Sequence, residues 1–224
     1  MPLKTKKLTV FVQGGLGNQL FCYAIARSYS LLHNRICALD NQSGYTHDQF
    51  QRVNRLHDLH LFNGCEEGLI KDDLMSRISK FLPIKYRSLV KEKYIGNVDL
   101  LSVEFKSNEV YFEGYWQSEK YFKTIKKTLL QELRPKNEVF NKDVLTRIQS
   151  SNSVFIHVRR IQYPHQLQLN YYEEAIAVMM KKVADPKFYV FGDDLDWINS
   201  QGVFKDNCEI IRMMVTEVKC QTIY

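Results

Sequence analysis

A chain of 224 residues with 45% apolar and 12% aromatic content can form one large domain or two small ones, each with a hydrophobic core. Its 31 basic and 25 acidic residues give a formal net charge of +6. This small surplus argues against a dedicated nucleic-acid binder. It fits an anionic ligand, a loose attraction to an anionic membrane surface, or a solvated surface with a few extra lysines.

The cysteines are odd in number, scattered and without a C-x-x-C pair, which argues against a disulfide framework and a zinc site. They are Cys22, Cys37, Cys65, Cys208 and Cys220. No segment approaches the roughly 18 consecutive apolar residues of a membrane span, and the short basic start leaves no room for a signal peptide. We therefore expect a cytoplasmic protein in a reducing compartment, with a peripheral contact to the inner membrane left open.

The first 40 residues follow a strand–helix–strand pattern. Residues 8–12 form a continuous apolar run, typical of a strand buried on both faces of a parallel sheet. A segment with helical spacing follows, for which Asn18 is the expected N-cap. Residues 35–39 then predict a second strand that ends at Asp40. This unit predicts an α/β fold.

Between the first strand and the helix lies a glycine-rich turn, with Gly14, Gly15 and Gly17 followed by Asn18 and Gln19. Glycines allow a close backbone approach, and the first amides of a helix can bind an anion. Leu20 replaces the third glycine of the dinucleotide fingerprint, and no P-loop lysine follows. An anion or nucleotide site and a tight turn without a ligand both stay open.

The middle of the chain is less regular. Residues 52–56 stand out, and residues 72–93 form a basic, helix-like stretch. Residues 110–112 predict a strand, and residues 119–133 a helix that ends before Pro135. Residues 134–152 are polar and mixed, so we expect the domain boundary there.

The second half repeats the α/β pattern. Residues 154–158 and 188–191 predict strands on either side of a helix at residues 171–184, and residues 207–211 predict another short strand. His157, Arg159 and Arg160 stand at the carboxyl end of the first of these strands, where ligands of open α/β sheets bind. Alternation places His157 and Arg159 on one side and Arg160 on the other. The three residues could hold a diphosphate or form a surface ion-pair cluster.

Asp193 and Asp194 follow the second strand of this half. Metal binding, recognition of a base and turn formation all stay open for them. Trp197 is expected in the core. His57 and His60 lack a third ligand at suitable spacing, so no metal site is predicted.

Five segments, in this order, resemble the α-1,2-fucosyltransferases of glycosyltransferase family 11. They are Gly14-Gly15-Leu16-Gly17-Asn18-Gln19-Leu20-Phe21; Glu113-Gly114-Tyr115-Trp116-Gln117-Ser118 with Glu119-Lys120-Tyr121-Phe122; His157-Val158-Arg159-Arg160; Tyr171-Tyr172 with Ala175-Ile176; and Phe188-Tyr189-Val190-Phe191-Gly192-Asp193-Asp194 with Trp197. Together they span about residues 8–200. The first and third are specific in combination, and each alone is weak.

The resemblance implies a GT-B-like fold of two Rossmann-like domains with a cleft between them. Residues 1–140 would form the acceptor-side domain and residues 141–224 an incomplete domain that binds GDP-fucose. The implied reaction is metal-independent, inverting transfer of L-fucose from GDP-β-L-fucose to the 2-hydroxyl of a terminal galactose. The implied partners are this donor and a galactoside acceptor, with no cofactor; the oligomeric state stays open.

The resemblance also implies roles for individual residues. Arg159 would be catalytic and hold the diphosphate, His157 and Arg160 would lie by the donor, and Asp194 would contact the guanosine. From the other domain, the cleft would be lined by Gly15, Gly17, Asn18 and Gln19.

The sequence departs from the family pattern in three places. Ile161-Gln162-Tyr163 stand where Gly-Asp-Tyr is usual, and Gly192 stands where serine is common. Residues 212–224 match no family motif, and a motif rich in serine, phenylalanine and tryptophan is missing. A truncated, inactive remnant that at most binds an anion is therefore the chief alternative, and an unrelated nucleotide-binding α/β protein is a third.

Overall fold

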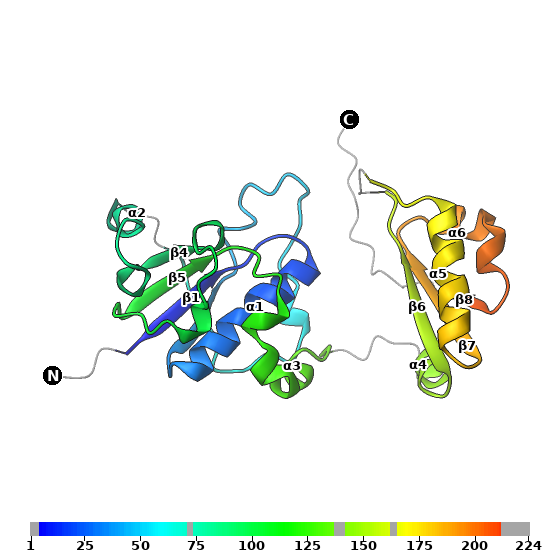
Figure 1. Ribbon diagram of the computed structural model, residues 1–224, viewed down its shortest axis with the longest axis horizontal. Coiled ribbons are helices and arrows are strands. Elements are labelled where there is room, and N and C mark those ends of the chain that lie inside the picture. The colour runs from blue at the N-terminus through cyan, green and yellow to red at the C-terminus, as the bar shows by residue number, and fades with distance from the viewer. Residues whose placement is uncertain (1–4, 71–73, 137–141, 162–164, 212–224) are drawn as a thin grey trace. The chain divides into compact units, whose positions relative to one another are not determined.

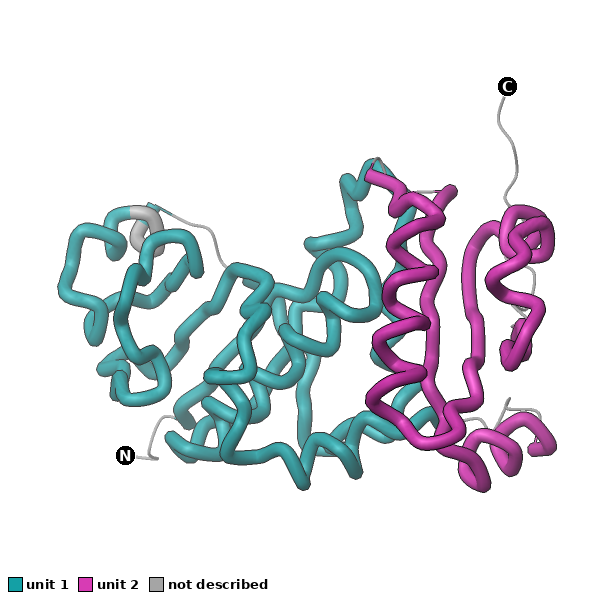
Figure 2. Tube along the Cα trace, turned by 45° about the vertical axis from the view of Figure 1, so that its right-hand side comes forward, with its two compact units in different colours: residues 1–137 teal, residues 138–224 magenta. Residues whose placement is uncertain are grey.

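The computed structural model describes residues 5–70, 74–136, 142–161 and 165–211. The chain divides into two compact units, Met1–Asn137 and Glu138–Tyr224 (Figure 2). Each unit has its own sheet and its own hydrophobic cluster, and each is described by itself.

Unit 1 is built on a five-stranded parallel sheet in the order β3-β2-β1-β5-β4 (Figure 1). The strands are β1 (Lys7–Phe11), β2 (Ile36–Asp40), β3 (Glu66–Glu67), β4 (Leu89–Lys91) and β5 (Glu109–Glu113). In the register, Phe11 pairs with Asp40 and Val10 with Phe112, so these three strands end at the same sheet edge. The segments that follow β1 and β5 are thereby brought together.

The central strand β1 and helix α1 (Leu16–Leu32) supply much of the core of unit 1. Leu8 and Val10 of β1 are fully buried, as the continuous apolar run predicted. The helix buries Tyr23, Ile25 and Tyr29 completely. Tyr29 packs edge-on against Phe112 of β5, with ring centroids 5.1 Å apart. The predicted strand–helix–strand unit is therefore confirmed.

Three local predictions in unit 1 were wrong. Helix α1 begins at Leu16 with Gly15 as its N-cap, so Asn18 lies inside the first turn. Residues 72–93 are not one helix, because α2 (Leu74–Ser79) is followed by Pro83, a short 3₁₀ turn and β4. Residues 119–133 form two 3₁₀ turns before α3 (Lys126–Glu132), and Tyr121 of the first turn packs edge-on against Trp116.

Unit 2 has a three-stranded parallel sheet in the order β6-β7-β8. Its elements are α4 (Lys142–Gln149), β6 (Asn152–Val158), α5 (Leu169–Lys182), β7 (Pro186–Gly192), α6 (Leu195–Ser200) and β8 (Cys208–Ile210). The predicted strands and the α5 helix are confirmed, whereas α4 lies in a segment expected to be a polar boundary. The core of unit 2 includes Tyr172 of α5 and Ile198 of α6.

Two parallel sheets with crossover helices confirm the predicted α/β class. In the segments that the structure describes, no helix combines the length and apolarity that crossing a membrane requires. Cys22, Cys37, Cys65 and Cys208 are free. The sulfur atoms of Cys37 and Cys65 lie 3.1 Å apart, a contact that the spacing of the cysteines did not reveal. Cys220 lies outside the described residues.

Candidate functional site

The glycine-rich turn leaves β1 at the sheet edge where β2 and β5 also end. Gly14 has a φ of +77°, a conformation in which a side chain is strained, and a Cβ there would lie 2.5 Å from Nδ2 of Asn18. A Cβ on Gly15 or Gly17 would meet nothing within 4 Å. The tip of the turn is therefore open to a group that approaches the backbone closely.

Gln19 supports this turn from inside the unit and does not line an open surface as the resemblance implied. Its side chain is fully buried. Its Nε2 donates to the carbonyl oxygens of Gly14 and Val53, both at 2.9 Å, and its Oε1 accepts from the amide of Arg55 at 2.8 Å. Gln19 thus joins the glycine-rich turn to residues 53–55, which the sequence alone did not connect to it.

Replacing Gln19 with leucine, which has a similar volume, is expected to lower the free energy of unfolding by about 2–3 kcal/mol, because one buried and two part-buried backbone groups lose their partner. Urea denaturation measures the change. Gln117→Leu is the matched control, since that exposed side-chain amide bonds to the Asn18 side chain at the surface, and its loss should cost under about 1 kcal/mol. Equal losses in the two variants would contradict the positioning role of Gln19.

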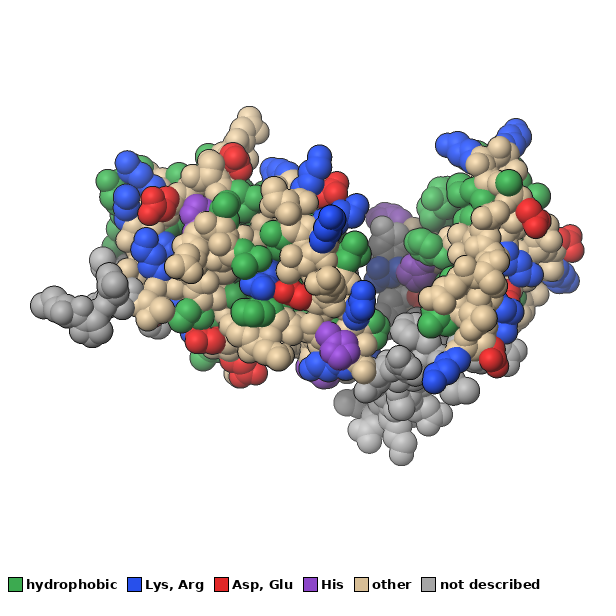
Figure 3. All heavy atoms as spheres, turned by 90° about the horizontal axis from the view of Figure 1, so that it is seen from below, with side chains coloured by type: hydrophobic (Ala, Val, Ile, Leu, Met, Phe, Trp, Pro, Cys, Tyr) green, Lys and Arg blue, Asp and Glu red, His purple; other side chains and the backbone are tan. Residues whose placement is uncertain are grey.

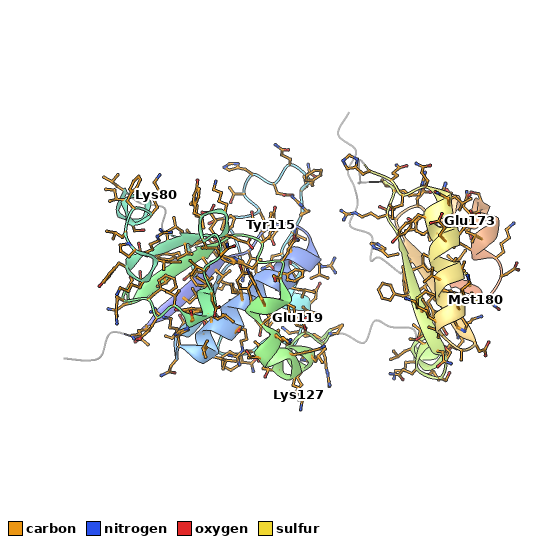
Figure 4. The ribbon with its side chains drawn as sticks, in the orientation of Figure 1. Lys80, Tyr115, Glu119, Lys127, Glu173 and Met180 are labelled. Atoms are coloured by element: carbon orange, nitrogen blue, oxygen red, sulfur yellow. The ribbon has the colours of Figure 1, made fainter. Side chains whose placement is uncertain are left out.

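The segment after β5 approaches the glycine-rich turn through a surface hydrogen bond. Nε2 of Gln117 donates to Oδ1 of Asn18 at 2.6 Å. Glu92 orients the same segment, because its Oε2 accepts from the amides of Tyr115 and Trp116, both at 2.8 Å. Trp116 has a φ of +56° and is fully buried. These contacts fix the backbone between β5 and the 3₁₀ turn at Glu119–Tyr121. Tyr115 remains accessible in this segment (Figure 4).

The cationic cluster of unit 2 stands at the end of β6 and divides between two environments, as alternation along the strand predicted. His157 and Arg159 are exposed, whereas Val158 between them is fully buried. The guanidinium of Arg160 lies on the other side, 4.0 Å from the ring centroid of Trp197. The structure thus gives His157 and Arg159 a common exposed face and packs Arg160 against α6.

The two aspartates after β7 hold different groups. The Asp193 carboxylate accepts the amides of Arg160 at 2.7 Å and Ile161 at 3.2 Å. Asp194 is the N-cap of α6, because its Oδ1 accepts the Trp197 amide at 3.0 Å, and its Oδ2 lies 3.4 Å from Nε of Arg160. Of the roles left open by the sequence, the turn-forming and capping role is the one visible in these contacts.

Gly192 stands at a close approach of β7, β6 and α6. A Cβ there would lie 2.5 Å from Cδ1 of Ile198 and 2.7 Å from the carbonyl oxygen of Val158. A serine could not be accommodated without a backbone shift. This departure from the family pattern therefore has a packing reason within this chain.

In the described segments, no group of three or more His, Cys, Asp or Glu residues could hold a metal ion. His57 lies 3.2 Å from Asp58, which Arg55 also contacts at 2.7 Å. The Arg55 guanidinium lowers the pKa of the Asp58 carboxyl. These contacts form a surface ion-pair cluster.

Sequence reasoning missed the roles of Glu92 and Asp193. Glu92 is more than 20 residues away from the amides that it binds, so no local motif marks it. Asp193 is recognisable in the sequence as a polar residue after a strand, but its partners belong to the loop after a different strand. The tandem of two aspartates at a strand end was the available signal.

Comparison with known proteins gives one family and several relatives. Residues 77–212, more than half of the chain, match the family described as Glycosyl transferase family 11. An alpha-1,2-colitosyltransferase of Escherichia coli is 28% identical over 201 residues, which cover 82% of this chain and 68% of that protein.

Among solved structures, NodZ alpha-1,6-fucosyltransferase soaked with GDP-fucose is similar, with a TM-score of 0.50 and 13% identity over 93% of this chain and 78% of that one. Selenomethionine NodZ from Bradyrhizobium matches with the same TM-score and coverage at 14% identity. At such identities the likeness concerns the fold alone.

Proposed function

The chain belongs to glycosyltransferase family 11, and on that premise we propose that it transfers L-fucose from GDP-β-L-fucose to the 2-hydroxyl of a terminal galactose. The acceptor is a galactoside of a cell-surface glycan precursor. The transfer inverts the configuration at the anomeric carbon and uses no metal ion. Unit 2 binds the donor in this proposal, and unit 1 contributes the acceptor side.

The observation that carries the proposal is the exposed pair of His157 and Arg159 at the carboxyl end of β6. A guanidinium can bind a phosphate through two parallel hydrogen bonds and stays charged throughout the accessible pH range. Asp193 holds the backbone just beyond the pair, so the end of the strand is fixed before a ligand arrives. Preorganisation of this kind lowers the cost of binding and of reaction.

In the proposed reaction, the galactose 2-oxygen attacks the anomeric carbon of fucose while the bond from that carbon to the β-phosphate oxygen of GDP breaks. The 2-hydroxyl releases its proton to water, and GDP leaves with the electron pair of the broken bond. Negative charge therefore grows on the diphosphate as the barrier is crossed. Arg159 stabilises that charge, and His157 lies by the nucleotide. Arg160 contributes indirectly, by fixing the loop against Trp197 and Asp194.

Unit 1 offers a surface suited to a sugar. Gly15 and Gly17 leave their backbone open, and the Asn18 side chain lies beside Gln117. Carbohydrate hydroxyls pair well with backbone amides and side-chain amides, which can donate as well as accept. We assign the acceptor side to Gly15, Gly17 and Asn18, with Gln19 as the residue that positions them.

Colitose, which is 3-deoxy-L-fucose, is a second candidate for the transferred sugar. The 28% identity with an alpha-1,2-colitosyltransferase, over most of both chains, favours it. The two sugars differ by one hydroxyl. A site that hydrogen-bonds the 3-hydroxyl would reject colitose strongly, whereas a site without such a contact would discriminate little.

We expect the full chain to release GDP from GDP-fucose only when a galactoside is present, and to form a fucosylated product in equal amount. Mass spectrometry of the product and a GDP assay measure both. Calorimetric titration with GDP and GDP-fucose, with ADP as control, reports donor binding separately. Binding of GDP without transfer would support an inactive remnant, and absence of both from folded protein would overturn the proposed donor site.

A further inference from the structure

A surface of unit 1, around α2 and the turn that follows it, exposes large apolar side chains. Phe81 and Leu74 are 80% and 72% exposed, and the other members expose close to half of their surface. We call these residues the α2 patch; its members are Leu74, Ile78, Phe81, Leu82 and Tyr86. Single exposed apolar residues are common on proteins, but five within 13 positions are not.

The patch lies in a basic stretch of the chain. Between Asp73 and Glu92 the sequence has five basic residues and no acidic one, against a net charge of +6 for the whole protein. They are Arg77, Lys80, Lys85, Arg87 and Lys91. Lys91 is compensated by Glu113 at 2.6 Å. Figure 3 shows a different face, on which basic, acidic and hydrophobic side chains are mixed.

Two lysines accompany the aromatic members of the patch. The ammonium of Lys80, labelled in Figure 4, lies 5.0 Å from the ring centroid of Phe81. The ammonium of Lys85 lies 5.2 Å from that of Tyr86. An aromatic ring with an ammonium group beside it suits the boundary between the acyl chains and the anionic headgroups of a membrane. The methylene groups of a lysine can lie along the apolar surface while its ammonium group stays among the headgroups.

The part of the patch that follows α2 is anchored to unit 1. The Lys85 carbonyl accepts the Lys106 amide at 2.8 Å, and Nε of Arg87 donates to the Leu82 carbonyl at 2.9 Å. Ile84, between the exposed residues, packs against the core of unit 1. The sequence thus directs one apolar side chain inward and holds its neighbours outward.

We propose that the α2 patch binds an anionic lipid surface. A nucleic acid would use the basic and aromatic residues but would leave Leu74, Ile78 and Leu82 without a role. A lipid interface uses both kinds, because the acyl region accepts the apolar side chains and the anionic headgroups accept the cations. Binding of this kind needs no membrane-spanning helix.

Co-sedimentation of the full chain with vesicles tests the proposal. The chain should pellet with phosphatidylcholine vesicles that contain about 30% phosphatidylglycerol, and much less with phosphatidylcholine alone. Binding should fall as salt rises from about 0.05 to 0.5 M, because salt screens the attraction of the lysines. The assay measures binding alone, so its outcome is separate from whether the chain transfers a sugar. Failure to pellet with the anionic vesicles would overturn the proposal.

Two double variants separate the apolar and the electrostatic contributions. Phe81→Ser with Leu82→Ser should weaken vesicle binding at least about tenfold. Lys80→Gln with Lys85→Gln should weaken it about fivefold for each charge removed. All four side chains are exposed, so far-UV circular dichroism should not change. The matched control is Leu130→Ser with Lys127→Gln, on the exposed side of α3, which should bind vesicles normally.

Equal losses in the control would overturn the assignment to the α2 patch. Two other occupants are tested in parallel. Patch-dependent binding of a short oligonucleotide, at least as tight as vesicle binding, would overturn the lipid assignment in favour of nucleic acid. A concentration-dependent dimer in sedimentation velocity, abolished by Phe81→Ser with Leu82→Ser, would show that a second copy of the chain covers the patch instead.

Discussion

Replacing Arg159 with alanine is expected to lower kcat/KM for sugar transfer at least about 100-fold, which corresponds to about 3 kcal/mol in the barrier. The loss should fall mainly on kcat, because the charge that Arg159 faces grows as GDP departs. Affinity for GDP should also fall, since the product carries the same diphosphate. Steady-state kinetics and calorimetry with GDP measure the two effects.

The geometry of β6 makes this a test of chemistry more than of folding. Arg159 is exposed and follows the buried Val158, so its side chain is not part of the packed core of unit 2. Arg160 is a poorer target, because its guanidinium packs on Trp197 and lies beside Asp194. Its removal would disturb the start of α6 as well as any ligand.

Two variants sharpen the experiment. Arg159→Lys keeps the charge but loses the two-pronged hydrogen bonding, so it should recover part of the activity. Lys182→Ala removes an exposed cation at the end of α5. The chain passes from there to the start of β7, at the sheet edge opposite to the one that carries Arg159, so this change should leave kcat/KM unchanged. If Arg159→Ala reduces activity no more than Lys182→Ala does, the assignment of Arg159 to the diphosphate is wrong.

The strands of both sheets were predictable because their signal is local. Leu8 and Val10 lie in an unbroken apolar run, and both are fully buried in the central strand. The βαβ connections of such runs leave few topologies open. In unit 2, residues 154–158 and 188–191 likewise formed the core strands β6 and β7.

The errors came from segments whose conformation depends on distant partners. Residues 72–93 have the composition of a basic helix, but Leu89 and Val90 pair with β5 and are buried there. Residues 119–125 have helical spacing, yet Tyr121 packs against Trp116, and the chain takes 3₁₀ turns. Weak local propensity yields to packing of this kind.

The candidate site shows the same limit at the level of side chains. The glycine-rich turn and the cationic strand end were visible in the sequence as motifs. Their supports were not, because Glu92, Gln19 and Asp193 each bind backbone groups of a segment remote in sequence. A motif identifies the residues that could face a ligand, whereas the residues that hold them in place are known only once the chain is folded.

Replacing Arg35 with methionine is expected to lower the free energy of unfolding of unit 1 by about 3–4 kcal/mol, a large share of the stability of a small domain. Arg35 is buried, and its two terminal nitrogens donate to the carbonyl oxygens of Lys7, Phe105, Ser107 and Asn108. Burial lowers the pKa of the guanidinium, but it remains charged at neutral pH. Methionine fills a similar volume but removes the guanidinium from all four carbonyls, of which the Asn108 carbonyl keeps the Lys7 amide at 2.8 Å.

Unfolding of unit 1 can be followed through the fluorescence of the fully buried Trp116, in a Trp197→Phe background that removes the second tryptophan. The control is Arg55→Met, since Arg55 is exposed and pairs with Asp58 at the surface, where such a pair contributes under about 1 kcal/mol. Arg35→Lys should fall between the two, because an ammonium keeps the charge but cannot reach four carbonyls with the same geometry. If Arg35→Met costs no more than Arg55→Met, water replaces the guanidinium at those carbonyls. The start of β1 and the segment before β5 would then be held by their strand pairing alone.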